Sequence, residues 1–459
     1  MSARALRVAA LAIGWVMVGV GAGNALAQAP TAPSGDAARA LPSIREWKLK
    51  NGLTVAHVER EGLPMVTVQV WYRFGSADEP KGQHGAARAF ERLMFLGSER
   101  LRPEDHRRYI EQVGGETSAL ATEDVTAFHQ TVPVEDLDLA LQLEAERMRS
   151  LLIRGETVDG IRPVMVDEVR RQESSPVYRA YQRLLSLVFA GHPYAWAPLG
   201  VASDLQRLGA PEVKALYDAY YVPSNALVVV VGGVGADAAQ KAVERWFGPL
   251  PAATRPPHPG DSVTVTEPTG PDRQALPGDA GGLVMAGYRL PRASDNDVLA
   301  LQVAGVVLTG GTSSRLHRRL VASKMADEIG GQVLVRRDGG VLVAFARFAT
   351  GAAGVEKALV GEIDRLAKGG PTAAELRRAK GQILGAAWLG MEGATGLANQ
   401  IGVSWGLTGK PAGFLADLTA LDKLGVADVR RATAKYLAHT RQVLVVADPS
   451  SAKPAGGAP

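Results

Sequence analysis

Apolar and polar stretches follow the same order twice along this chain. In the first half, the apolar run at residues 66–72 predicts a strand after the turn signal Asn51-Gly52, and residues 118–132 are strand-like. A helix-like stretch at residues 82–98 lies between them. Further helices are expected over residues 103–115, 134–152, 158–189 and 236–247, and a last strand over residues 226–231.

The second half repeats this order after a segment rich in proline and glycine, residues 249–282. Since proline and glycine interrupt helices and strands, this segment is the natural linker. Strands are then expected near residues 282–288, 329–337, 341–348 and 442–446. Helices are expected over residues 295–307, 354–367, 373–389 and 426–437.

The composition indicates a large globular protein. A chain of 459 residues, 46% of them hydrophobic, is too long for one ordinary core and indicates two or more domains. The 51 basic residues are nearly matched by 47 acidic ones, so the net charge of +4 argues against a nucleic-acid surface. Cysteine is absent, which excludes disulfides and a thiol nucleophile.

The N-terminus predicts export. Arg4 and Arg7 precede an apolar stretch at residues 8–20, and Ala25-Leu26-Ala27 fits a cleavage site. We expect a signal peptide over residues 1–27, a flexible leader over residues 28–44 and a periplasmic or secreted bacterial protein with no stable membrane insertion after cleavage. A transmembrane anchor is the alternative, which the short, glycine-interrupted apolar run disfavours.

Three segments downstream of the helix-like stretch carry a resemblance to a known family. They read GHPYAWAPLG at residues 191–200, YYVPSNALVVVVGGV at residues 220–234 and RWFGPLP at residues 245–251. Their order and spacing resemble the M16 family of inverted zincins, the group of pitrilysin, insulinase and mitochondrial processing peptidase. The resemblance implies an α+β fold of two tandem homologous M16-type domains that face each other around a cavity. The expected domains cover residues 45–251 and 282–448, with a linker at 252–281 and a tail at 449–459.

The family's zinc motif, His-x-x-Glu-His, aligns with residues 88–92, which read Arg-Ala-Phe-Glu-Arg. In active members the two histidines and a distal glutamate hold zinc, and the central glutamate is the general base. The resemblance assigns the histidine positions to Arg88 and Arg92, the base position to Glu91 and the distal ligand position to Glu168. A guanidinium has no lone pair for a metal and stays protonated, so neither zinc nor another cofactor is predicted.

The two arginines are expected to replace the charge of the ion. Two carboxylates at a partly buried site need a counter-charge. Arg88 lies three residues from Glu91 on the helix, and Arg92 can reach Glu168 across a helix pair. The alternative is that both arginines belong to a solvated face.

No other histidine offers a replacement metal site. His84 precedes Arg88 by four residues but has no second histidine at i+3 or i+4. His192 falls in the HPY segment, which in the family is a structural turn. The eight histidines are His57, His84, His106, His129, His192, His258, His317 and His439.

The second half lacks a pair of residues that the family uses with substrate. In active M16 enzymes an Arg and a Tyr approach the zinc site from the opposite domain. The resemblance places the Tyr position near Asp327 and the Arg position near Leu320 or Val321. Arg319 could take the Arg role, but its basic neighbours make a solvated helix face the better interpretation.

The sequence argues less clearly against peptide binding than against zinc binding. Family members bind substrate as a strand added to an exposed sheet edge, where main-chain hydrogen bonds give the affinity. The corresponding residues here are Thr117, Ser118, Ala119, Leu120 and Ala121. Backbone pairing does not depend on their side chains, so they form a candidate substrate-binding strand. An ordinary internal strand is the alternative.

Three functions remain open at this point. The first is a pseudopeptidase that forms a heterodimer with an active M16 zinc metallopeptidase in peptide or protein degradation or processing. The second is an active zinc endopeptidase with unusual ligands, and the third is a stand-alone peptide-binding or scaffold protein. We favour the first, because the segments that resemble the family are present while both histidine ligands are replaced by Arg88 and Arg92.

Overall fold

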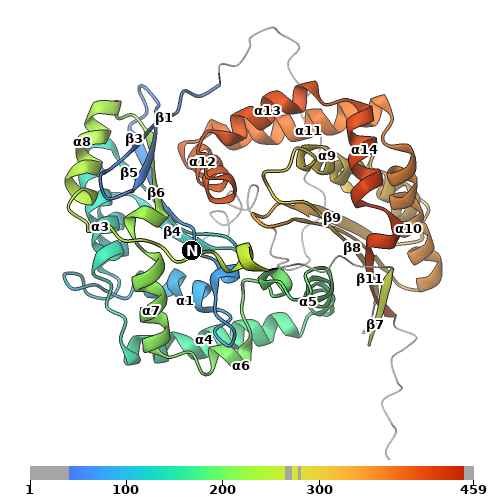
Figure 1. Cartoon of the computed structure of the whole chain (residues 1–459), viewed down its shortest axis with the longest axis horizontal. Helices are drawn as coiled ribbons and strands as arrows, with labels where there is room; N and C mark the ends of the chain where they lie inside the picture. Colours follow the sequence, from blue (N-terminus) through green and yellow to red (C-terminus); the bar gives the residue numbers. More distant parts are fainter. Residues whose placement is uncertain (1–40, 264–270, 278–280, 449–459) are drawn as a thin grey trace, which may run out of the picture.

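The computed structural model describes residues 41–263, 271–277 and 281–448. Each half of the sequence forms one β-sheet with its own helices, as Figure 1 shows. The expected signal peptide, most of the leader and the tail lie outside the described residues. Within the described ranges, no helix combines the length and hydropathy that a membrane crossing requires.

The first sheet has six strands in the order β1-β2-β6-β3-β5-β4. They are β1 (Arg45–Lys48), β2 (Thr54–Glu59), β3 (Met65–Tyr72), β4 (Glu116–Ala121), β5 (Thr126–Pro133) and β6 (Ala226–Gly232). Neighbours are antiparallel except β2 and β6, which pair in parallel. The apolar runs of β3 and β6 lie at the centre of the sheet, where side chains on both faces are buried.

The α-helices of the first half lie on one face of this sheet, except α5 (Pro176–Val188), which packs on the second sheet. They are α1 (Ala86–Leu93), α2 (Asp105–Gln112), α3 (Leu137–Arg149), α4 (Gly155–Glu173), α5 (Pro176–Val188), α6 (Ala202–Leu205), α7 (Ala210–Tyr220) and α8 (Ala236–Phe247). Because side chains alternate along a strand, Val228 and Val230 of β6 point into this core. Val229 and Val231 point to the opposite face.

The second sheet repeats the topology with the order β7-β11-β8-β10-β9. Its strands are β7 (Asp272–Pro277), β8 (Gly282–Arg289), β9 (Glu328–Leu334), β10 (Val341–Phe348) and β11 (Gln442–Asp448). The α-helices of the second half are α9 (Val298–Thr309), α10 (Ala352–Gly369), α11 (Ala373–Glu392), α12 (Ala394–Thr408), α13 (Gly413–Lys423) and α14 (Val426–Tyr436). As β2 does with β6, β7 pairs in parallel with the last strand of its half, so the predicted internal repeat is confirmed.

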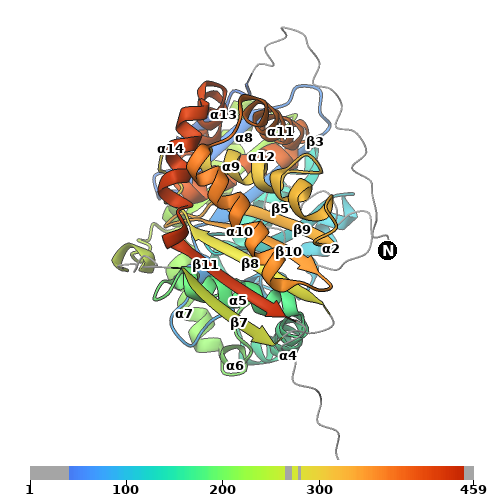
Figure 2. The same ribbon diagram turned by 90° about the vertical axis from the view of Figure 1, so that its right-hand side faces the viewer.

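The halves interlock by exchanging one helix each. Helix α5 of the first half packs on β8 and β11 of the second sheet, as Figure 2 shows, and α12 of the second half packs on β3 and β6. Glycines permit both contacts: a Cβ at Gly402 of α12 would lie 1.9 Å from the Trp71 ring, and one at Gly287 of β8 would lie 2.9 Å from Leu184 of α5. The expected two facing domains are therefore also joined by swapped helices.

Three details of the predicted elements need correction. The expected linker at 252–281 contains β7, an edge strand whose exposure alternates along its length. The expected helix over residues 158–189 is two helices, because Ser175 caps a new helix that begins with Pro176. Helices α12 and α13 were not predicted at all.

Candidate functional site

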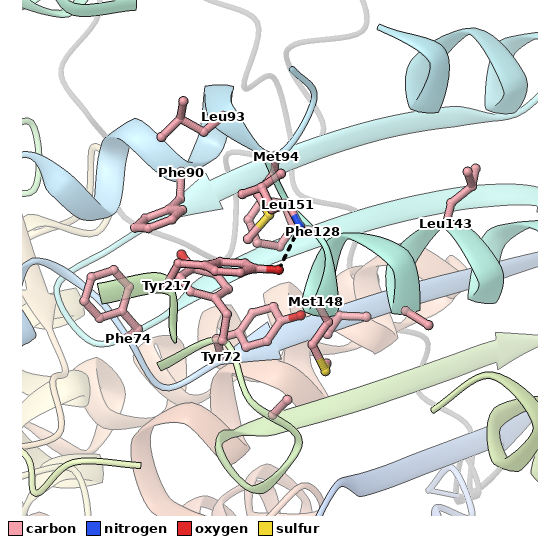
Figure 3. Packing of buried hydrophobic residues seen from close by; sticks show 14 of the residues in the cluster. Tyr72, Phe74, Phe90, Leu93, Met94, Phe128, Leu143, Met148, Leu151 and Tyr217 are labelled. Carbon is pink, nitrogen blue, oxygen red and sulfur yellow. Dashed lines mark hydrogen bonds between the residues drawn. The ribbon is translucent and has the colours of Figure 1, made fainter. Parts of the chain in front are cut away.

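Helix α1 carries the residues aligned with the zinc motif, and an aromatic cluster fixes its buried face. Phe90 packs against Tyr221 at 4.5 Å and Phe74 at 5.8 Å between ring centroids. Figure 3 shows Phe90 directed toward Phe74 and Tyr217, whose hydroxyl accepts a hydrogen bond from the Leu151 N–H. Because this face is buried in the core, Arg88 and Arg92 face the other way and reach Glu168 of α4, and Glu91 pairs with Arg88.

The N-terminus of α1 is held by a buried carboxylate. Glu79 accepts hydrogen bonds from the N–H groups of Gly85 at 2.9 Å and Ala87 at 2.7 Å. These are donors that a helix start leaves without an intrahelical partner. Burial raises the pKa of Glu79, and the nearby His84 and the hydrogen bonds from the N–H groups of Ala87 and Gly85 oppose that shift. The sequence reasoning missed Glu79, since nothing in its local pattern marks it as a cap.

The ion pairs predicted between the arginines and the two carboxylates are present. Arg88 pairs with Glu91, and its Nη2 lies 3.0 Å from Oε1 of Glu168 on α4. Arg92 Nη2 lies 3.0 Å from Oε2 of the same Glu168. The four side chains are between 9% and 29% exposed, so they form a partly buried cluster and not a solvated face.

The charges in this cluster stabilise each other. Burial raises the pKa of Glu91, and Arg88 opposes that shift. Burial alone would lower the pKa of Arg88, but Glu91 and Glu168 raise it above its ordinary value. One oxygen of Glu91 and Nε of Arg88 are buried without a hydrogen-bond partner, so the arginines satisfy Glu91 only in part, whereas both oxygens of Glu168 are paired.

These residues do not fit a zinc ion. Neither arginine can donate a lone pair, and both carboxylates already face guanidinium groups. Within the described parts of the chain, no cluster of three or more His, Asp or Glu side chains could hold a metal. His84, one turn before Arg88, stacks on Trp196 with ring centroids 5.4 Å apart, and its Nδ1 lies 3.7 Å from Glu79.

The candidate peptide-binding residues lie together on β4 beside α1. Residues Thr117 to Ala121 all belong to β4, the last strand of its sheet, and among the described residues this strand pairs only with β5. Thr117 uses its hydroxyl to donate to the His129 carbonyl on β5 at 3.0 Å. The alternative of an internal strand is therefore wrong for β4, which is an edge strand and lies close to α1 and α2.

The candidate residues of the second half lie apart from this cluster in the hydrogen-bond network. Arg319 is exposed and Leu320 is fully buried, both in the π-helix η8 (His317–Val321). The Asp327 N–H donates to the Arg347 carbonyl at 2.8 Å. Among the described residues, no hydrogen bond or ion pair joins this segment to the α1 cluster. Instead, the neighbouring Arg315 forms a double hydrogen bond with Glu375.

Comparisons with known proteins agree with the fold. Residues 54–199 match the family model described as insulinase (peptidase family M16), and residues 207–383 match the one described as peptidase M16 inactive domain. The zinc protease PqqE of Helicobacter pylori is 29% identical over 347 residues, which cover 74% of this chain and 78% of that protein. The mitochondrial-processing peptidase subunit beta of Lentinula edodes is 22% identical, with 85% of this chain and 86% of that protein covered.

Solved structures show the same architecture. A protease from Helicobacter pylori superposes with a TM-score of 0.84 at 26% identity, over 89% of this chain and 100% of that one. A peptidase M16 inactive domain from Pseudomonas fluorescens gives a TM-score of 0.81 at 20% identity, over 90% and 99% of the two chains. With both halves matched in sequence and in topology, the chain belongs to the M16 peptidase family.

Proposed function

We propose that this protein is a non-catalytic M16 homologue that acts as the partner subunit of an active M16 zinc metallopeptidase. The ion-paired cluster of α1 and α4 carries the proposal: Arg88 and Arg92, which the family resemblance aligns with the two zinc-binding histidines, bind Glu91 and Glu168. A guanidinium at each position prevents zinc binding by its chemistry and by its charge.

The retained architecture supports a role in an assembly. Both sheets, the swapped helices and the free edge of β4 are those of an intact M16 chain, although the zinc ligands are replaced. One matching family model is described as an inactive domain, and one similar protein is named as a subunit. A stable complex of this kind buries roughly 2,000 Å² or more. We place it in the periplasm, after signal cleavage near Ala27.

Co-expression tests this assembly. The mature chain is produced with an M16 protein that is encoded beside it and has an intact His-x-x-Glu-His motif, and the mixture is resolved by size-exclusion chromatography at micromolar concentration. Co-elution and a changed peptidase activity of the partner are expected. Separate elution with unchanged activity, or the absence of such a neighbouring gene, favours the stand-alone scaffold and contradicts the partner role.

Metal analysis tests the catalytic alternative separately. Several similar proteins are named zinc proteases, so an active enzyme with unusual ligands is the competing function. We expect the purified chain to bind no stoichiometric zinc and to cleave no peptide. One equivalent of zinc, together with peptidase activity that a chelator removes, would show that the chain is an enzyme.

A further inference from the structure

A buried histidine between the two halves contacts a carboxylate of each. His258 precedes the short helix η7 (Pro259–Ser262), and its side chain is 1% exposed. Its Nδ1 lies 2.6 Å from Oδ1 of Asp78, which belongs to the first half. Its Nε2 lies 2.6 Å from Oδ2 of Asp338, in the turn between β9 and β10 of the second half.

A carboxylate oxygen at each ring nitrogen favours a charged ring. A neutral imidazole has a single N–H and can donate to only one of two carboxylates, whereas the imidazolium donates to both. Burial alone would lower the pKa of His258, but the hydrogen bonds with Asp338 and Asp78 raise it to about 9. At neutral pH, His258 therefore links the halves by two charge-assisted hydrogen bonds.

Other charged groups face His258 from the surrounding segments. The Arg337 guanidinium lies against the ring, with Nη2 close to Nδ1 and 2.6 Å from Nε2 of His258, and this positive charge opposes the rise in the pKa of His258. The same guanidinium lies 3.7 Å from Asp78 and 3.7 Å from Asp338. His192 Nε2 lies 3.8 Å from Asp338. Burial lowers the pKa of His192 to about 4, so at neutral pH it adds no charge.

Tyr194 and Asp124 complete the junction. The Tyr194 hydroxyl donates to Asp124 and accepts from the Asp338 N–H at 3.2 Å. The Arg337 N–H donates to Asp124 at 3.1 Å. The carboxylates here are Asp78, Glu123, Asp124 and Asp338, and the cations are Arg336, Arg337 and His258. Loss of the His258 proton removes one positive charge from between Asp78 and Asp338, which weakens the attraction between the two sides.

The junction is also connected to the candidate site. Asp78, which contacts His258, is followed directly by Glu79, which binds the N–H groups of Gly85 and Ala87 at the start of α1. Both carboxylates are buried, with 2% and 6% of each residue exposed. A shift of Asp78 must therefore move the anchor of the helix that carries Arg88 and Arg92.

We propose that His258 is a charged clasp that holds the two halves together and, through Asp78 and Glu79, positions helix α1. The clasp closes when His258 is protonated and loosens when the proton is lost. This device concerns how the chain holds its own site, and it is independent of whether a partner subunit exists.

Hydrogen exchange tests the link from the clasp to α1. The full mature chain is compared with its His258→Gln variant at pH 7, since glutamine can donate to one carboxylate but carries no charge. Amides of residues 84–93 are expected to exchange about tenfold faster in the variant, as the loss of one hydrogen bond to a charged group implies. His439→Gln, at an exposed histidine, is the matched control and should change nothing. Equal protection of residues 84–93 in the wild type and the variant would overturn the proposal.

Two further measurements do not depend on the folding of that variant. Asp338→Asn removes the carboxylate in the second half while keeping its shape, and it should speed exchange at the same first-half amides. In the wild type, the NMR titration of the His258 ring should have its midpoint near pH 9, well above the ordinary value of 6.5. A midpoint at or below 6.5 would contradict a charged clasp.

Discussion

Arg92 of α1 and Glu168 of α4 face each other across two helices, with Nη2 of the arginine 3.0 Å from Oε2 of the carboxylate. Arg88 binds the other oxygen of the same carboxylate, also at 3.0 Å. One glutamate, which the family resemblance aligns with a distal zinc ligand, thus neutralises the charge of both arginines aligned with the histidines. Glu168 is therefore the residue that joins both arginines of α1 to α4.

Replacing Glu168 by glutamine should destabilise the protein. The variant leaves Arg92 without its ion-pair partner and Arg88 with Glu91 alone. Since the three side chains are about a quarter exposed, water offsets part of the loss, and we expect about 1–2 kcal/mol. The difference in the free energy of unfolding between the variant and the wild type, measured in urea, gives this loss.

Asp218→Asn, which breaks the exposed ion pair with Lys214, is the control and should destabilise the protein by less than about 0.5 kcal/mol. Equal losses of stability in the two variants would show that the cluster stabilises the protein no more than an exposed ion pair does.

Restoring both histidines should restore metal binding but little catalysis. In the variant Arg88→His plus Arg92→His, two imidazoles at i and i+4 join Glu168 as a possible ligand set. Zinc affinity, measured by calorimetry and elemental analysis, is expected to rise. Turnover should stay low, because the positions of the family's Arg and Tyr near residues 320 and 327 hold other side chains. Peptidase activity close to that of an active relative would disprove that interpretation of the second half.

The stability of the protein should depend on the titration of His258. Its folded-state pKa of about 9 lies above the ordinary 6.5, so its stabilising contribution is complete below pH 6.5 and is lost as the pH rises through 9. The shift corresponds to roughly 3 kcal/mol at most. We expect the free energy of unfolding to fall more steeply between pH 6.5 and 9 in the wild type than in His258→Gln. If the free energy of unfolding falls with pH equally in the wild type and in His258→Gln, the titration of His258 does not contribute to stability.

The ion-paired cluster could be predicted from the sequence because its geometry is mostly local. Arg88, Glu91 and Arg92 share one short helix, and the resemblance to the M16 family indicated Glu168 as their partner. The clasp could not be predicted in this way. His258 is 180 positions from Asp78 and 80 positions from Asp338, and no periodic pattern connects them. Only the way the two halves interlock brings these three residues together.

Helix α12 was missed for a related reason. Its 15 residues include Gly396, Gly402 and Gly406 together with several β-branched residues, a composition with low intrinsic helix propensity. The segment is helical because it covers the first sheet, where its apolar side chains are buried with Trp71 and Val229. Tertiary packing therefore overrides local preference, and glycine is required where the helix crosses the sheet.

This packing leads to a prediction about two glycines in neighbouring helices. A Cβ at Gly402 of α12 would lie 1.9 Å from Cε2 of the buried Trp71, so Gly402→Ala forces the exchanged helix away from the first sheet. We expect a net loss of about 1–3 kcal/mol despite the better helix propensity of alanine. A Cβ at Gly385 of α11 would meet no atom within 4 Å, so the same substitution there should stabilise the protein by up to about 1 kcal/mol. Thermal and urea unfolding of both variants provide the comparison. If Gly402→Ala were as stable as Gly385→Ala, close contact between α12 and Trp71 would not be what joins the halves.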